Sequence, residues 1–187
     1  MKLLLLLFVL SSVFAYAQKE KPVPISRQPV DQERLTIYRT FLASYLEKDS
    51  KTSLNISQTT APFPSRDYDA KGCMAGFRPD DLKVSEVHFF GADAFPGNHL
   101  VDPKRYKVHD PGDAIKQGQT IDKAVHEGFV HALFSFSEIV FDPSHTHAAF
   151  SYSFFCGGLC GHGATVVYEL NDGRWQSSSR ICGFWIS

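Results

Sequence analysis

The sequence predicts an α+β fold in which an N-terminal amphipathic helix packs on a C-terminal antiparallel β-meander, with a loop-rich insert between them. Three observations carry this prediction. Apolar residues recur at helical spacing between residues 31 and 48, and they alternate with polar residues in the last 55 positions. Between them, Gly, Pro and Asp recur every few positions from 65 to 118. The length of 187 residues fits one domain, which we expect to span residues 31–187.

The N-terminus has the features of a signal peptide over residues 1–17. It begins with a positive charge at Lys2, continues with an apolar run over residues 3–10, and ends in Ala-Tyr-Ala, the small-residue pattern that precedes cleavage. The apolar stretch is shorter than a usual membrane span of about 20 residues. We therefore expect export, a mature chain that begins at Gln18 with a flexible lead over residues 18–30, and no membrane span after cleavage.

Two helices are predicted. Asp31 can cap the first, and one apolar stripe then continues through Lys48. This stripe consists of Leu35, Tyr38, Phe41, Leu42, Tyr45 and Leu46. A second, short helix is predicted over residues 120–129, where Ile121, Ala124, Val125 and Phe129 line one side. Between the helices, residues 53–57 and 84–90 predict one strand each.

The last 55 residues predict the sheet. Residues 133–141 are rich in β-forming types, residues 142–145 are typical of a turn, and apolar and polar residues alternate from 148 to 155. A loop over residues 156–163 precedes a further strand over 164–170. Asn-Asp-Gly then favours a tight hairpin, whose return strand carries the tryptophan of a Gly-x-Trp sequence.

Charge and composition exclude several classes of function. The chain has 19 Lys and Arg against 20 Asp and Glu, so it lacks the basic excess of proteins that bind nucleic acid or an anionic membrane. Disordered proteins are poor in apolar residues, whereas this chain is 43% hydrophobic and 13% aromatic. It contains no phosphate loop, dinucleotide fingerprint, serine nucleophile elbow or His-Glu-x-x-His motif. We expect no cofactor, and binding is favoured over catalysis.

The four cysteines predict two disulfides, because an even number of cysteines in an exported chain indicates bridges. Cys156 and Cys160 flank a glycine-rich turn that can bring their Cα atoms within bridging distance. Their pairing leaves Cys73 with Cys182, although the two alternative connectivities stay open at this stage. A redox-active Cys-x-x-x-Cys pair is disfavoured, because thioredoxin-like chemistry uses Cys-x-x-Cys at a helix start.

His145, His147 and His162 form the sharpest candidate for a metal site. If the first two lie in extended structure, their rings project from one face, and His162 lies in the loop that joins the next two strands. Three imidazoles and a water have the composition of a catalytic zinc site. Histidines that face solvent or lie in the core are the more common outcome, so the cluster supports only an alternative function.

Two further arrangements are weaker. A nucleophilic Cys160 with a nearby histidine would need a free thiolate and an orienting third group. Glu138, Asp142 and Glu169 could act as acid or base. However, Glu138 and Glu169 lie in predicted strands with apolar positions opposite, which predicts that both face solvent.

Four segments near the C-terminus form a recognisable set: residues 137–142, residues 152–163, the Gly-Arg-Trp of 173–175 and the ending Trp-Ile-Ser. Together they resemble a set of uncharacterised exported bacterial proteins that share a strand, a Cys-Gly-x-Leu-Cys-Gly loop, a second strand and a Gly-x-Trp hairpin. The resemblance covers about the last 50 residues. It implies a bacterial periplasmic or secreted protein, and it supports the meander and the paired loop cysteines. No activity or functional residue comes with it.

The sequence therefore favours a non-enzymatic, disulfide-stabilised binding or interaction module that is periplasmic or secreted. Its expected partner is an unidentified cell-envelope or extracellular ligand, which the stapled loop between Cys156 and Cys160 would help to bind, since loops on rigid sheets commonly carry binding residues. The alternative is a metal-dependent hydrolase that uses His145, His147 and His162.

Overall fold

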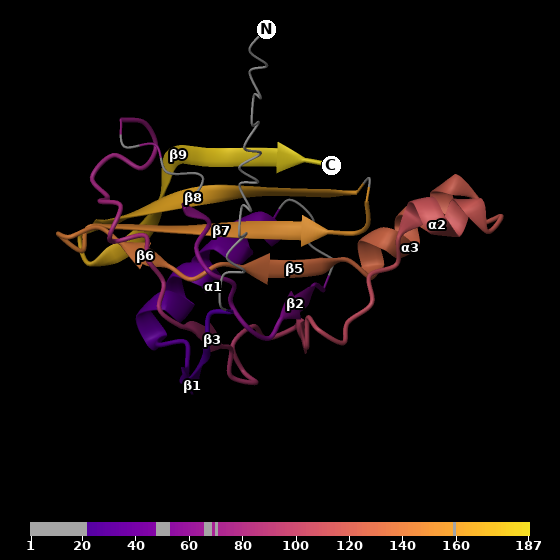
Figure 1. The fold of residues 1–187 in the computed structure, drawn as a ribbon, viewed down its shortest axis with the longest axis horizontal. Coiled ribbons are helices and arrows are strands. Elements are labelled where there is room, and N and C mark those ends of the chain that lie inside the picture. Colours follow the sequence, from indigo (N-terminus) through magenta and orange to yellow (C-terminus); the bar gives the residue numbers. More distant parts are fainter. Residues whose placement is uncertain (1–21, 48–52, 66–68, 70, 159) are drawn as a thin grey trace, which may run out of the picture.

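The computed structural model describes residues 22–47, 53–65, 69, 71–158 and 160–187 (Figure 1). The described part combines a large, mostly antiparallel sheet with three helices. It contains no helix with both the length and the apolar character to cross a membrane. In chain order the elements are β1 (Ile25–Pro29), α1 (Gln32–Leu46), β2 (Asn55–Ser57), β3 (Val87–Phe89), β4 (His99–Val101), α2 (Pro111–Lys116), α3 (Ile121–Val130), β5 (Leu133–Phe136), β6 (Val140–Phe141), β7 (His147–Phe155), β8 (Gly161–Asn171) and β9 (Arg174–Ile186).

The main sheet has seven strands in the order β4-β2-β5-β7-β8-β9, with β6 paired to β7 (Figure 1). From β5 to β9 every pairing is antiparallel, which agrees with the predicted sheet in the C-terminal part of the chain. Strand β2, however, runs parallel to both β4 and β5. The sheet is thus mixed at one side, because β2, which follows α1, and β4, which comes from the insert, extend it beyond the meander.

The hairpin between β8 and β9 follows from its turn residues. Asn171 pairs with Arg174, and the two residues between them, Asp172 and Gly173, have φ angles of 50° and 71°. Positive φ at both central positions is the type I′ geometry that matches the twist of the flanking strands. Asn-Asp-Gly therefore sets both the position and the register of this hairpin.

Residues 25–29, expected within the flexible lead, form β1. This strand runs parallel to β3, with Ile25 beside Val87, and the two strands make a separate small sheet. Part of the lead is thus tied to the insert by backbone hydrogen bonds, including one of 2.9 Å from the N–H of Val30 to the carbonyl of Phe89.

Helix α1 begins where Asp31 caps it, because the side chain of Asp31 accepts a hydrogen bond of 2.9 Å from the N–H of Arg34. Its buried face packs on the aromatic residues of β5 and β7. At the centre, the fully buried Tyr38 donates a hydrogen bond of 2.6 Å from its hydroxyl to the carbonyl of Ser137. Burial of such large rings is the main source of stability for this layer, at about 25 cal/mol per Å² of apolar surface.

The opposite face of the sheet is covered in part by the insert. Turns within residues 71–84 place Met74, Phe77 and Leu82 against Ala149 and Val167. The disulfide between Cys73 and Cys182 joins this covering segment to β9. The insert is loop-rich, as predicted, but it also supplies a second apolar core.

Helices α2 and α3 form an arm beside the sheet rather than a layer across it (Figure 1). Of the residues predicted to form the apolar side of the second helix, some are buried in the structure and others are exposed. Ala124 is fully buried, whereas Ile121 and Phe129 are 65% and 50% exposed. Exposed apolar side chains on a helix often mark a binding site, so the exposed face of α3 is where we look for the candidate site.

Candidate functional site

The predicted histidine cluster does not form. His145 lies in the turn after β6 with a φ of 54°, and its ring stacks on Phe141 at 4.3 Å between centroids. Its Nε2 lies 3.0 Å from Oε1 of Glu33. The Nδ1 atom of His147 lies 3.4 Å from Oδ2 of Asp142. The two rings thus have separate carboxylate partners.

His162 lies at the other end of the same strand pair. His147 is opposite Glu169, and His162 is opposite Phe154, so seven residues of β8 separate the two positions. At about 3.3 Å per residue this separation is about 23 Å, which no single metal ion can bridge. Within the described residues no group of three His, Cys, Asp or Glu side chains could hold a metal ion. The alternative of a metal site on these three histidines is therefore not supported, because the spacing of two brings rings to one face only inside a strand.

The cysteines form two disulfides, Cys73 with Cys182 and Cys156 with Cys160. Their Cα atoms are 5.8 Å and 5.0 Å apart. This is the connectivity that the spacing favoured. It leaves no free cysteine in the described chain, so a thiolate nucleophile at Cys160 is excluded.

The carboxylates are not solvent-facing as a group. Glu169 accepts a hydrogen bond of 2.8 Å from the hydroxyl of Ser178. Asp142 is buried and accepts hydrogen bonds of 2.8 Å from the N–H groups of Thr146 and His147. Glu138 is also buried, which corrects the prediction that it faces solvent. The chain leaves the β5 ladder at Phe136, so the alternation of the strand does not extend to Glu138.

An apolar cavity of about 540 Å³ lies where the last turn of α1 meets α3 and the strands β7 and β8. This volume is within the range of small-molecule sites, about 300–1,000 Å³. Most of its wall is aromatic or aliphatic, with a few polar groups among them. The lining residues are Ser44, Tyr45, Leu46, Leu54, His126, Phe129, Val130, Tyr152, Phe154 and His162.

Two of the polar residues that line this pocket, a tyrosine and a histidine, are hydrogen-bonded to each other. The hydroxyl of Tyr45 and Nε2 of His162 are 2.9 Å apart and form a hydrogen bond. The ring of His162 stacks on that of Phe154 at 5.3 Å. Burial lowers the pKa of His162 below its ordinary value of 6.5, so the imidazole is neutral at pH 7. The pocket thus presents a fixed, uncharged polar pair within apolar walls.

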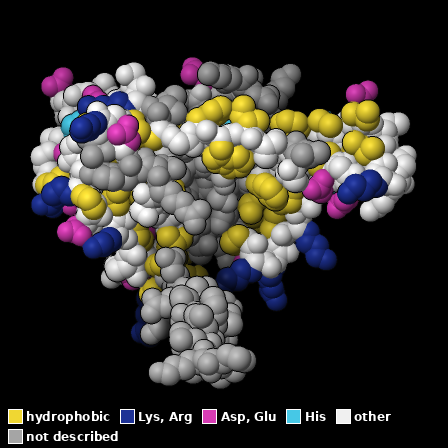
Figure 2. Space-filling view, turned by 45° about the horizontal axis from the view of Figure 1, so that its top comes forward, with side chains coloured by type: hydrophobic (Ala, Val, Ile, Leu, Met, Phe, Trp, Pro, Cys, Tyr) yellow, Lys and Arg dark blue, Asp and Glu magenta, His cyan; other side chains and the backbone are white. Residues whose placement is uncertain are grey.

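A second hollow of about 420 Å³ continues from the first, since both are lined by Phe129, Phe154 and His162. Its other walls include the Cys156–Cys160 disulfide and the exposed Phe184 and Ile186 near the end of β9. Figure 2 shows hydrophobic side chains gathered between the sheet and the helical arm. The stapled loop that the sequence singled out is therefore one wall of an apolar groove.

Sequence reasoning singled out His162 as a candidate metal ligand and the Cys156–Cys160 loop as a binding feature, and it did not name Tyr45 or Phe129 as site residues. Both belong to stripes with helical spacing, which the sequence predicts to be core.

The chain matches no protein-family model and no solved structure. A protein of Bacillus sp. (strain OxB-1), described as "Uncharacterized protein in nit 5'region", is 33% identical to this chain over 81 residues. The similarity covers 43% of this chain and 30% of the Bacillus protein, so the chain spans less than a third of that relative's length. That description names no activity for the Bacillus protein.

Proposed function

We propose that this protein is an exported, disulfide-stabilised binding module that takes a small, apolar and uncharged ligand in the pocket between α1, α3 and the β7–β8 pair. The observation that carries the proposal is the cavity of about 540 Å³ with aromatic walls and one Tyr45–His162 pair. Ligand sites commonly have this composition, in which apolar walls supply affinity and a few polar groups fix orientation.

The charge of the pocket limits the ligand chemistry. No Lys, Arg, Asp or Glu is among the residues that line it. Of its two histidines, His126 and His162, the second is neutral at pH 7 because burial lowers its pKa. A charged ligand would lose hydration without gaining an opposite charge. An uncharged ligand with one hydrogen-bonding group, directed at the Tyr45–His162 pair, fits these walls best.

The test is fluorescence titration of the full protein with N-phenyl-1-naphthylamine, an uncharged apolar dye. We expect Phe129→Ala to weaken dye binding at least about tenfold, because Phe129 lines both hollows and is half exposed. Phe155→Ala is the matched control, since Phe155 is 43% exposed and lines neither hollow. Equal effects of the two variants, or no effect of Phe129→Ala, would contradict the assignment of the pocket.

Export is tested separately by the intact mass of the protein recovered from an expressing bacterial host. We expect a chain that begins at Gln18 and has four hydrogens fewer than the reduced form, because two disulfides require an oxidising compartment. A full-length, reduced chain in the cytoplasm would refute export without bearing on the pocket.

A further inference from the structure

A buried carboxylate outside the proposed pocket orients a histidine. The side chain of Glu138 is 4% exposed, and its Oε1 accepts hydrogen bonds from the hydroxyl of Thr60 and, at 2.7 Å, from the N–H of His88. The same oxygen lies 3.0 Å from Nδ1 of His88. Because an ionised carboxylate only accepts hydrogen bonds, the proton of the imidazole lies on Nδ1 in this contact.

The opposite nitrogen of the ring therefore carries a lone pair. Nε2 of His88 lies 3.8 Å from Oε1 of Glu86, and the histidine side chain is 23% exposed. In the neutral imidazole this places two hydrogen-bond acceptors next to each other without a hydrogen between them. One donor atom placed about 2.8 Å from each would satisfy both, since a 3.8 Å separation leaves room for a single nitrogen to contact the two.

Glu138 also has an unused oxygen. No described residue donates a hydrogen bond to its Oε2, and this atom is not among the sealed, unpartnered polar atoms of the described chain. Glu138, His88 and Glu86 all line one polar cavity of about 470 Å³. The carboxylate is thus buried by its neighbours but keeps one oxygen accessible from the cavity.

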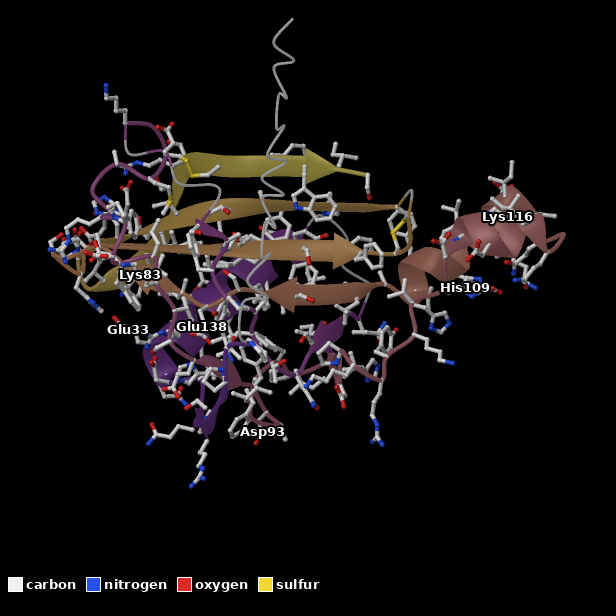
Figure 3. The ribbon with its side chains drawn as sticks, viewed as in Figure 1. Glu33, Lys83, Asp93, His109, Lys116 and Glu138 are labelled. Atoms are coloured by element: carbon white, nitrogen blue, oxygen red, sulfur yellow. A yellow bond between two sulfur atoms is a disulfide. The ribbon has the colours of Figure 1, made fainter. Side chains whose placement is uncertain are left out.

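The charges around this cavity favour a cation. Its lining includes four carboxylates, Asp31, Asp81, Glu86 and Glu138, and two cationic side chains, Arg34 and Lys83. Arg34 is paired with Asp31, Lys83 with Asp80, and Asp81 with Arg78. Among the described residues, the lining carboxylates without a Lys or Arg partner are therefore Glu86 and Glu138, and these two supply the negative charge. Figure 3 labels Lys83 and Glu138 in the same half of the molecule, away from His109 and Lys116 on the helical arm.

We propose that this cavity binds the ammonium group of a primary amine, with Nε2 of His88 and the carboxylate of Glu86 as its two acceptors. Glu138 is the positioning residue, because its Oε1 fixes the proton on Nδ1 and so turns the lone pair of Nε2 toward the ligand. An ammonium group is compact and has three donors, which suits two acceptors 3.8 Å apart.

This site is independent of the proposed apolar pocket. Arg34, at the start of α1, lines the polar cavity, and Tyr45, in the last turn of α1, lines the apolar one. Eleven residues of helix separate them, which is about 16 Å. Loss of one site by substitution is therefore expected to leave ligand binding at the other unchanged.

The test is ¹⁵N NMR of the histidine rings in the full protein at about pH 8, during titration with n-butylammonium. We expect a selective shift of Nε2 of His88 with a dissociation constant in the millimolar range, and no such shift with n-butanol, the uncharged isostere. Glu86→Gln, at an exposed side chain, should weaken binding at least about tenfold. Glu47→Gln is the charge-matched control at the far end of α1 and should leave it unchanged.

Three results would overturn the proposal. They are equal shifts with amine and alcohol, equal weakening by the two variants, and a His88 ring that is protonated on both nitrogens at pH 8 before any amine is added. A parallel titration with Nα-acetyl-lysine methylamide identifies the source of the ammonium. Tighter binding than n-butylammonium indicates a lysine side chain of a peptide, and equal or weaker binding indicates a free amine; either result supports the ammonium site.

Discussion

Asp142→Asn removes a charge that holds the turn between β6 and β7. Oδ1 of Asp142 accepts the N–H groups of Thr146 and His147, each at 2.8 Å, and Oδ2 accepts the hydroxyl of Ser144. Burial alone would raise the pKa of this carboxyl. The hydrogen bonds from Ser144, His147 and Thr146 outweigh burial and lower the pKa from 3.8 to about 2.

The size of the effect follows from this pKa. The pKa of Asp142 is lower in the folded state than in the unfolded state. Its contribution to the free energy of unfolding is therefore complete well above pH 3.8 and is lost as pH falls through 2. A fall from 3.8 to about 2 corresponds to a contribution to the free energy of unfolding of about 2 kcal/mol at pH 7, about half of that at pH 3 and well under 1 kcal/mol at pH 2. The side chain is 6% exposed, so solvent screening reduces these values little.

Urea unfolding of the wild-type protein and Asp142→Asn, with disulfides intact, measures this contribution. We expect the variant to be about 2 kcal/mol less stable at pH 7, with a difference that shrinks below about 0.5 kcal/mol at pH 2. Asp93→Asn, at an exposed aspartate, is the control and should change stability by less than about 0.5 kcal/mol. A difference that stays constant between pH 7 and pH 2 would refute the reasoning, because it would not arise from ionisation of Asp142.

Three further predictions concern stability and use the same urea assay. Cys73→Ser opens a long loop and should cost about 5 kcal/mol, against about 2 kcal/mol for Cys156→Ser, in the chain-entropy account; equal costs would contradict it. Tyr38→Phe removes the donor to the buried carbonyl of Ser137 and should cost about 1–3 kcal/mol; a neutral result would mean that water replaces the hydroxyl. Burial lowers the pKa of His162 in the folded state. The neutral imidazole therefore contributes fully to the free energy of unfolding above pH 6.5, and this contribution is lost as pH falls through the lowered pKa. His162→Gln should remove part of the decline in stability between pH 7 and pH 5.

Local patterns predicted the C-terminal sheet because its pairings are local. Alternation over residues 148–155 and the Asn-Asp-Gly turn each determine a strand or a hairpin without information from elsewhere in the chain. The parallel strands β2 and β4 were less accessible to sequence reasoning. They are three residues long, and their partners lie more than 40 positions away, so no periodic pattern marks the pairing.

The errors at the candidate site have the same origin. His145 and His147 would share a face only in extended backbone, but His145 has a positive φ and belongs to a turn. The pocket draws on α1, α3 and two strands, so its composition depends on tertiary contacts that spacing alone cannot specify. Phe129 shows this clearly, since the same apolar stripe that predicts a core helix leaves this ring half exposed beside the pocket.

The break between β5 and β6 explains how an acidic residue comes to be buried in this sheet. The N–H of Glu138 donates to the carbonyl of Ala61 at 2.7 Å, the carbonyl of Ser137 accepts from Tyr38, and the carboxylate accepts from Thr60 and His88. These partners come from α1, from the segment after β2 and from β3, so a carboxylate that would be costly alone is supported by three separate parts of the chain. The hydrogen bonds from Thr60 and His88 all reach Oε1, whereas Oε2 stays accessible from the cavity. The accessible Oε2 and the lone pair of His88 are not used by these contacts within the fold, and they are the reason for assigning a ligand to this cavity.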